Sequence, residues 1–253
     1  MPEPSIHLSS YEIEAKVESS HWWFVVRRKL LGLFLSFFSL PHEYVVLDIG
    51  CGTGSNLKIL EMTGRTVIGL DRSFYALSLA RKKAKFPLIN GDLTKLPIRP
   101  QSVGLIVAMD ILEHLDDDAT GIRSFHQALE RQGVLIVTVP AFGFLWGIQD
   151  EVTGHKRRYS RQEIVNKLRR EGFEIMKSSY FNFFLFFPIL IARRLIHLVG
   201  LRIESENEIN FPAVNFFLKA IFSLESYVLR WCPFPFGVSI FCIAKKSESG
   251  RCQ

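Results

Sequence analysis

Short apolar runs alternate with amphipathic segments through the middle of the chain. The runs have the length of strands and are followed closely by glycine, proline or aspartate, whereas the segments between them repeat apolar positions at helical spacing. This alternation predicts a parallel sheet with helices on both of its faces. We expect strands at 44–49, 66–70, 87–90, 103–109, 134–139, 173–180 and 237–244, and helices at 55–62, 74–84, 119–130 and 161–171.

Two parts of the chain depart from this alternation. Residues 10–39 predict one helix that ends before Pro41, and an apolar run at 181–192 is followed by an amphipathic helix at 211–230. The expected fold class is therefore α/β, with a doubly wound, Rossmann-like sheet of seven mostly parallel strands. We expect one domain that consists of an N-terminal helical cap (1–43), a core (44–180), an apolar helical insertion (181–235) and a final strand (236–246).

Composition excludes several classes of protein. The chain has 253 residues, of which 48% are hydrophobic and 22% charged, so a sizeable core can form and global disorder is excluded. The cysteines lack CxxC spacing, which excludes a zinc finger and argues against a disulfide framework. The first twenty residues contain several glutamates and no apolar run, so we expect no signal peptide and a cytoplasmic location. The net charge of +6 is too small by itself to indicate a nucleic-acid partner, and we expect none.

Glycine occupies every second position of the loop after the first strand, at Gly50, Gly52 and Gly54. Such a loop lets the backbone pass close to a ligand, and the helix that follows offers free N–H groups to an anion. Asp48 precedes the loop and suits an ammonium group, and Asp71 ends the next strand, where a ribose-binding carboxylate is expected. An acid that follows the third strand could meet an adenine amine. Together these groups describe S-adenosylmethionine; the alternative is a tight strand–helix turn without a ligand.

From residue 44 to residue 140 the chain resembles the class I S-adenosylmethionine-dependent methyltransferases. It departs from the usual family pattern at 103–104 and at 132–133, outside the expected cofactor shell. The segment His21-Trp22-Trp23-Phe24, the loop 154–160 and the element 235–239 are similar to a mostly bacterial subgroup, which extends the resemblance to nearly the whole chain. The resemblance implies a cofactor shell of Asp48, Gly50, Cys51, Gly52, Gly54, Asp71, Arg72, Asp92, Leu93 and Asp110.

A second group of polar residues follows the fourth strand, at Asp110, Glu113 and His114. In doubly wound sheets this edge is where substrate meets cofactor, and the three side chains converge if the segment turns helically. Three interpretations stay open. One is a general base that removes a proton from an acceptor hydroxyl, for which we favour His114. Another is a divalent metal such as Mg²⁺, because the segment resembles the metal-binding one of ubiquinone-pathway O-methyltransferases. The third is a helix cap that braces the sheet.

The loop after the fifth strand is strongly basic. Residues 151–170 contain seven lysines and arginines against Glu151 and Glu163, a net charge of +5. Such a segment suits a phosphate or carboxylate on the acceptor, and the alternative is a solvated surface. His155 and Tyr159 lie in this loop and are further catalytic candidates, which we rank below His114.

The apolar run 181–192 is shorter than the roughly 20 residues that span a bilayer. Because Arg193 and Arg194 follow it, we interpret it as an interfacial or acceptor-lining element at an anionic membrane surface. Packing on the sheet and a dimer interface are the alternatives. The aromatic residues Trp22, Trp23 and Phe24 could cover the cofactor and exclude water.

The sequence thus predicts a methyltransferase that acts at oxygen on a small or lipid-linked acceptor, with a peripheral position at the inner face of the membrane. One rival is a non-catalytic pseudo-methyltransferase that serves as a membrane scaffold. Another is a nicotinamide-dependent oxidoreductase, which the glycine spacing disfavours. Methylation of a nucleic acid is disfavoured because no base-holding motif follows the fourth strand.

Overall fold

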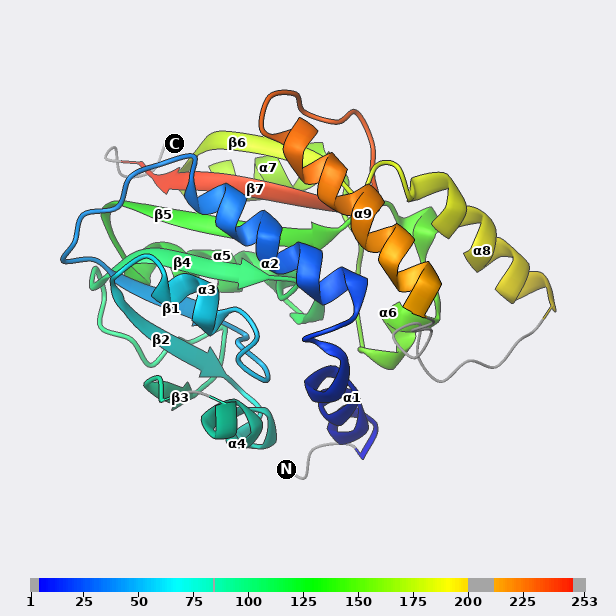
Figure 1. The fold of residues 1–253 in the computed structure, drawn as a ribbon. Helices are drawn as coiled ribbons and strands as arrows, with labels where there is room; N and C mark the ends of the chain where they lie inside the picture. Colours follow the sequence, from blue (N-terminus) through cyan, green and yellow to red (C-terminus); the bar gives the residue numbers. More distant parts are fainter. Residues whose placement is uncertain (1–4, 84, 200–211, 248–253) are drawn as a thin grey trace.

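A twisted sheet of seven strands in the order β3-β2-β1-β4-β5-β7-β6 runs through the molecule (Figure 1). The computed structural model describes residues 5–83, 85–199 and 212–247. Neighbouring strands are parallel except at β7, which pairs antiparallel with β5 and β6, so the predicted fold class is confirmed. The strands are β1 (Val45–Ile49), β2 (Thr66–Asp71), β3 (Leu88–Asn90), β4 (Val103–Met109), β5 (Leu129–Pro140), β6 (Phe173–Phe181) and β7 (Ser239–Lys246).

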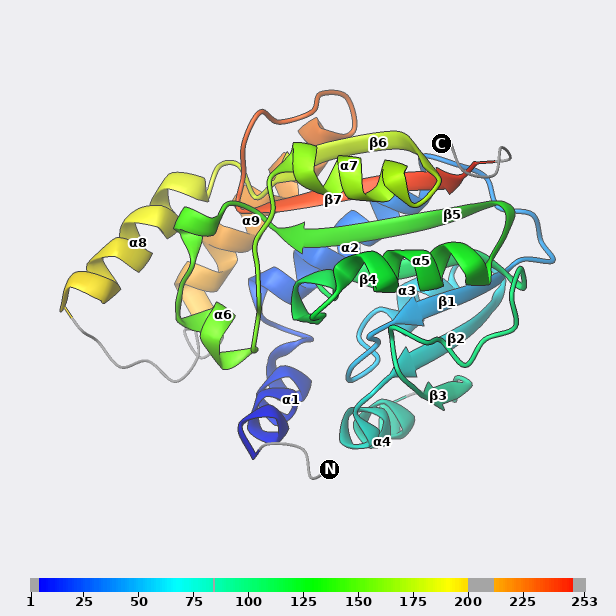
Figure 2. The same ribbon diagram turned by 180° about the vertical axis from the view of Figure 1, so that it is seen from behind.

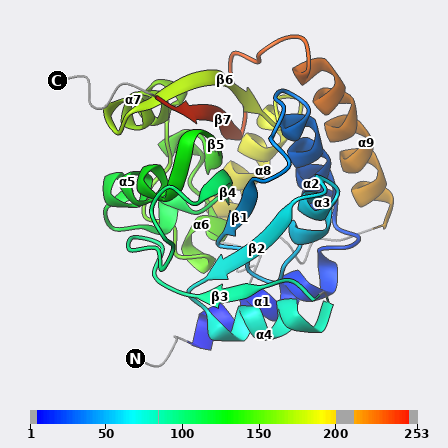
Figure 3. The ribbon, with the colours of Figure 1, turned by 90° about the vertical axis from the view of Figure 1, so that its left-hand side faces the viewer.

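Helices cover both faces of the sheet. One face carries α2, α3 and α9, and the other carries α5 and α7 (Figures 2 and 3). The helices are α1 (Ser5–Val17), α2 (Trp22–Leu35), α3 (Leu57–Glu61), α4 (Phe74–Lys83), α5 (Asp118–Ala128), α6 (Ile148–Val152), α7 (Arg161–Arg170), α8 (Phe186–Val199) and α9 (Pro212–Leu229). Two 3₁₀ turns, η1 (Leu112–His114) and η2 (Gly143–Leu145), follow β4 and β5.

The strand register brings the loops that follow β1, β2, β4 and β5 to one edge of the sheet. Ile49 at the end of β1 lies opposite Leu70 and Ala108, and Met109 at the end of β4 lies opposite Thr138. Because these strands are parallel, the glycine loop, Asp71 and the segment after β4 meet at the same edge.

The N-terminal cap consists of two helices, and the prediction of one helix over 10–39 is wrong. The chain breaks after Val17, and α2 starts at Trp22 with His21 as its N-cap, whose side chain accepts a hydrogen bond from the Trp23 N–H. At the break, the Glu18 carboxylate accepts hydrogen bonds from the Thr53 hydroxyl and from Lys83 Nζ at 2.7 Å. These contacts tie the break to the glycine loop and to α4.

The boundary between α5 and β5 also differs from the prediction. Asp117 caps α5, since its carboxylate accepts from the N–H groups of Ala119 and Thr120 at 3.0 and 3.2 Å. The helix ends at Ala128, and β5 begins at Leu129 rather than at 134, because Leu129 is buried opposite Val103. A register irregularity in β4 follows this pairing.

The apolar insertion forms two helices, α8 and α9. The helix predicted at 211–230 is confirmed over its described part, and the connection 200–211 lies outside the described residues. The buried Glu225 of α9 accepts hydrogen bonds from three consecutive N–H groups, at Asn182, Phe183 and Phe184. This carboxylate fastens α9 to the turn that leads into α8. Among the described residues, no helix has the length and apolarity needed to cross a bilayer.

Candidate active site

One cavity of about 520 Å³ lies at the edge of the sheet where these loops meet. Its first part is lined by the glycine loop and the end of β2, and its second part by the segment after β4 and the loop after β5. Helices α1 and α2 contribute Glu14, Trp22, Phe24 and Arg27, and α8 and α9 complete the wall. The residues expected to bind the cofactor and those expected to bind the acceptor therefore line the same cavity.

The glycine loop is open toward this cavity. Gly52 has φ +52°, a conformation that costs little for glycine only, and a Cβ built on it meets just Glu14 Oε1, at 3.9 Å. Asp71 braces the loop, because one carboxylate oxygen accepts from the Gly52 N–H at 2.9 Å and the other from the Ser73 N–H at 2.8 Å. The loop and Asp71 thus form a rigid cradle whose open side faces the cavity.

Two buried carboxyl groups lie close to this cradle. Asp48 is buried beneath the loop, neither of its oxygens has a hydrogen-bond partner among the described residues, and burial raises its pKa to about 7. Glu14 of α1 lines the cavity beside Gly52, and burial raises its pKa to about 7 as well. Arg27 opposes both shifts by its charge. Carboxyls in such a position suit a ligand that carries a cation.

The expected cofactor shell divides into residues that line the cavity and residues that support it. Cys51 is buried against β2, and Gly54, at φ +82°, packs on Ala80, so both stabilise the turn from behind. Asp92 is exposed and accepts from the Thr94 N–H and hydroxyl, both at 2.8 Å, and these hydrogen bonds lower its pKa. The lining members are Gly50, Gly52, Asp71, Arg72, Leu93 and Asp110.

Asp110 is held in place by two partners. Arg27 of α2 forms an ion pair with it at 2.9 Å, and the Thr138 hydroxyl donates to it at 3.0 Å. The same guanidinium donates to the Met109 carbonyl at 2.6 Å. Asp110 has φ +58° and directly follows β4, so the chain turns sharply before η1. Asp110, Glu113 and His114 all line the cavity, but Asp110 is paired with Arg27.

Glu113 and His114 converge with His155 instead. One ligand atom from each of these three side chains lies within 4.8 Å of the others. Glu113 is fully buried, and burial together with the charge of Asp110 raises its pKa well above the usual range. The rings of His114 and His155 lie 4.7 Å apart between centroids. Two imidazoles and one carboxyl form a donor set that suits transition metals better than Mg²⁺, which prefers oxygen ligands.

The sequence analysis missed Asp150, which fixes the orientation of His155. Its Oδ1 lies 2.7 Å from His155 Nδ1. Arg158 donates to both carboxylate oxygens at 2.9 Å, and the Gly147 N–H donates at 2.8 Å. Burial alone would raise the pKa of Asp150, but the hydrogen bonds from His155 and Arg158 outweigh burial and hold it below the usual range. The only signal in the sequence was an acid five residues before His155.

Several charges of the basic segment 151–170 have partners within the protein, while Arg161, Arg169 and Arg170 of α7 are exposed. Lys156 forms an ion pair with Asp116, and Arg157 donates to the carbonyls of Leu115 and Asp116. Lys167 pairs with the buried Asp118 at 3.0 Å. The charges therefore hold the loop onto the segment between β4 and α5.

Tyr159 lies in the core and does not line the cavity. Its side chain is fully buried, and its hydroxyl donates to Asp118 at 2.9 Å. Burial, assisted by the charge of Asp118, raises its pKa. We therefore remove Tyr159 from the catalytic candidates, because its hydroxyl already has a buried partner.

Comparison with known proteins assigns the central part of the chain. Residues 47–137 match the model of the methyltransferase domain. A probable S-adenosylmethionine-dependent methyltransferase of Mycolicibacterium smegmatis is 30% identical over 135 residues, which are 51% of this chain and 52% of the relative. A malonyl-[acyl-carrier protein] O-methyltransferase of Hamiltonella defensa is 32% identical over 47% of this chain and 49% of the relative. The match thus spans about half the length of these curated relatives.

Solved structures support the same fold over a longer part of the chain. A putative methyltransferase of Haloferax volcanii, solved in complex with the Trm112 methyltransferase activator, superimposes with a TM-score of 0.63 at 16% identity over 98% of this chain and 100% of its own. An S-adenosylmethionine-dependent methyltransferase of Mesorhizobium loti superimposes with a TM-score of 0.58 at 18% identity over 85% of this chain and 96% of its own. At these identities the likeness concerns the fold.

Proposed function

We propose that this chain, whose residues 47–137 belong to the class I S-adenosylmethionine-dependent methyltransferase family, transfers a methyl group to an oxygen of a largely apolar acceptor. The observation that carries the proposal is the single cavity, which the glycine loop and Asp71 line on one side and Glu113, His114 and His155 on the other. S-adenosylmethionine, when bound, supplies an activated methyl group on a sulfonium centre. The protein holds donor and acceptor in one orientation, which accounts for a large part of such rate enhancements.

The residues around the first part of the cavity fit this cofactor. Gly52 leaves room for a ligand against the backbone, and Asp71 is placed to accept from ribose hydroxyls. Glu14 lines the cavity and supplies a carboxyl for an ammonium group, Asp48 adds a second carboxyl behind the glycine loop, and Leu93 offers an apolar wall for a base. Each chemical part of the cofactor therefore finds a group of complementary character.

His155 is the general base of the proposed reaction, in place of the initially favoured His114. The Asp150 carboxylate accepts the hydrogen bond from His155 Nδ1, so Nε2 carries the lone pair. His155 lines the cavity, and Nε2 lies 3.8 Å from Glu113 Oε1, too far for a hydrogen bond. Nε2 takes the proton from the acceptor hydroxyl, and the charged Asp150 stabilises the imidazolium that results.

Oxygen as the acceptor atom is supported by this base, since a hydroxyl must lose a proton when it is methylated. The relative from Hamiltonella defensa named as an O-methyltransferase agrees with oxygen. An apolar acceptor is supported by the cavity wall, to which α8 contributes Ile189 and Ile196 and α9 contributes Leu218. Arg158 and Arg193 line the same cavity and offer donors to a polar group on such an acceptor.

Calorimetry with adenosylhomocysteine, the demethylated product of the cofactor, tests the proposal. We expect binding to the full chain and a loss of binding in Asp71→Asn, whereas Asp117→Asn, at the exposed N-cap of α5, serves as the matched control. Mass spectrometry of small molecules that co-purify with the chain then identifies the acceptor class. If the unmodified, folded chain produces no heat with this compound, the proposed function is overturned.

A further inference from the structure

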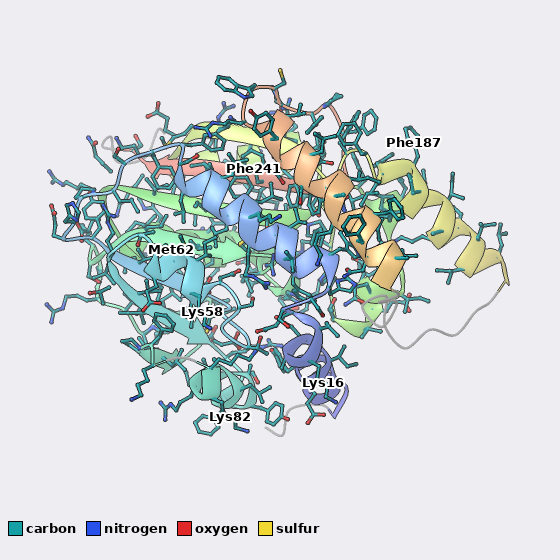
Figure 4. All side chains as sticks on the ribbon, viewed as in Figure 1. Lys16, Lys58, Met62, Lys82, Phe187 and Phe241 are labelled. Atoms are coloured by element: carbon teal, nitrogen blue, oxygen red, sulfur yellow. The ribbon has the colours of Figure 1, made fainter. Side chains whose placement is uncertain are left out.

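The outer faces of α8 and α9 carry large apolar side chains that contact solvent. On α8 these residues recur at helical spacing, at Phe187, Ile191, Leu195 and Leu198, the last of which is 78% exposed. Figure 4 shows Phe187 directed away from the body of the molecule. The corresponding residues on and after α9 are Val214, Phe216, Phe217, Ile221, Leu224, Tyr227 and Trp231. Exposed apolar side chains that recur along one helix face in this way mark an interaction site.

The charges on these two helices have one sign at the surface. Arg194 of α8 and Arg230, which follows α9, are exposed, and Lys219 is half-buried. The sequence of α8 contains no acidic residue, and the one acid of α9, Glu225, is buried on backbone N–H groups. Arg193 was expected at the membrane surface beside Arg194, and this expectation is wrong. Arg193 points inward, donates to the Leu145 carbonyl and lines the cavity. Apolar faces with exposed arginines complement an anionic lipid surface.

The same two helices flank the cavity. The inner face of α8 contributes Ile189, Arg193 and Ile196 to the wall, and α9 contributes Val214 and Leu218. Figure 1 shows both helices at the end of the molecule where β4 and β5 finish. A surface that receives the outer faces would therefore lie next to the wall of the acceptor site.

We propose that the outer faces of α8 and α9 rest in the interfacial region of an anionic bilayer, with both helices in the membrane plane. Resting on the proposed function, a second step follows: the acceptor is a lipid that reaches His155 between these helices. Trp231 and Tyr227 have the amphipathic rings that favour the headgroup level. The connection 200–211, outside the described residues, contains Glu204, Glu206 and Glu208, so apolar contact rather than net charge dominates the binding.

Co-sedimentation of the full chain with lipid vesicles tests this surface. We expect binding to phosphatidylglycerol vesicles and weaker binding to phosphatidylcholine vesicles. The double variant Phe217→Ser/Leu224→Ser should weaken partition about tenfold or more, because two large apolar side chains leave the interface. The matched control is Met62→Ser/Phe74→Ser, which removes two side chains of similar exposure outside α8 and α9 and should bind as the unmodified chain does. Arg194→Gln/Arg230→Gln should reduce the preference for phosphatidylglycerol severalfold for each charge.

The outcomes separate this proposal from the proposed function. All three double variants change exposed residues, so calorimetry with adenosylhomocysteine should give unchanged affinity and confirm the fold. If the unmodified chain binds adenosylhomocysteine but no vesicle, the membrane surface is overturned while the methyltransferase stands. Dimers in sedimentation velocity that Phe217→Ser/Leu224→Ser dissociates, without vesicle binding, would assign the surface to a second copy and also overturn the proposal.

Discussion

His155 Nδ1 lies 2.7 Å from the Asp150 carboxylate, which also accepts two hydrogen bonds from Arg158. The hydrogen bonds from His155 and Arg158, together with the arginine charge, keep Asp150 ionised although it is buried, and an ionised carboxylate can only accept. The imidazole is therefore fixed in one tautomer. This relationship connects the basic loop to the chemistry of the cavity.

Asp150→Asn should lower kcat about a hundredfold or more, because an amide can donate to Nδ1 and so stabilise the wrong tautomer. His155→Gln should cost at least as much, while His126→Gln, on α5 outside the cavity lining, should leave kcat unchanged. Methyl transfer from labelled S-adenosylmethionine measures the effect once the acceptor is known. Equal kcat values for unmodified chain and His155→Gln would remove His155 as the base.

Cofactor affinity should rise with pH between about 6 and 8. Asp48 and Glu14 have pKa values of about 7 without ligand, so both are largely protonated at the lower pH. A bound ammonium favours the carboxylate form and lowers these pKa values, so binding releases protons and strengthens as pH rises, by up to about tenfold per group and pH unit.

Calorimetry of adenosylhomocysteine binding in buffers with different ionisation enthalpies counts the released protons. Asp48→Asn and Glu14→Gln should each flatten the pH profile. A profile that stays the same in both variants would contradict the assignment of these carboxyls.

Gly52→Ala should abolish cofactor binding. The new Cβ lies in the open side of the loop, where only Glu14 is near, and the positive φ adds strain of about 1 to 2 kcal/mol. Gly64→Ala is the matched control, because Gly64 has φ +71° and a Cβ there meets no atom within 4 Å. Both variants should lose similar stability in urea unfolding, and only Gly52→Ala should lose binding. Binding that survives in Gly52→Ala would place the cofactor elsewhere.

Tyr159→Phe should reduce stability without reducing kcat. The change removes the hydroxyl that donates to buried Asp118 and costs about 2 kcal/mol, since Lys167 still pairs with that carboxylate. Urea unfolding and turnover of the same preparation measure the two effects. A loss of kcat at full occupancy with unchanged stability would restore Tyr159 as a catalytic residue.

Chelation with EDTA should leave turnover unchanged if His155 acts as the base. The residues that could hold a metal are Glu113, His114 and His155, and they offer Mg²⁺ one oxygen-bearing side chain, because Asp110 pairs with Arg27. Loss of activity on chelation, with recovery on adding a metal, would favour the metal interpretation and move His155 from base to ligand.

The sequence allowed the sheet and the cofactor loop to be predicted because both depend on local patterns. Apolar runs define strands. Gly50 and Gly52 mark a turn because glycine adopts the positive φ that this turn requires. The acceptor side depends on contacts between distant segments. Glu113 meets His155 only after the loop beyond β5 folds back, and Arg27 reaches Asp110 from a helix more than eighty residues earlier.

Charge was the least reliable guide. The basic residues of 151–170 predicted an anion site. Lys156 instead pairs with Asp116 and Lys167 with Asp118, acids that lie 40 and 49 residues earlier in the chain and that a count of local charge does not include. Likewise, the break between α1 and α2 follows from contacts of Glu18 with Thr53 and Lys83, which helical periodicity cannot reveal.

The three hydrogen bonds that Glu225 accepts from residues 182–184 have a mechanical consequence. They join α9 to the turn at the start of α8, so a displacement of one helix at this point carries the other with it. The wall that α8 and α9 give to the cavity is therefore anchored at residues 182–184, directly after β6.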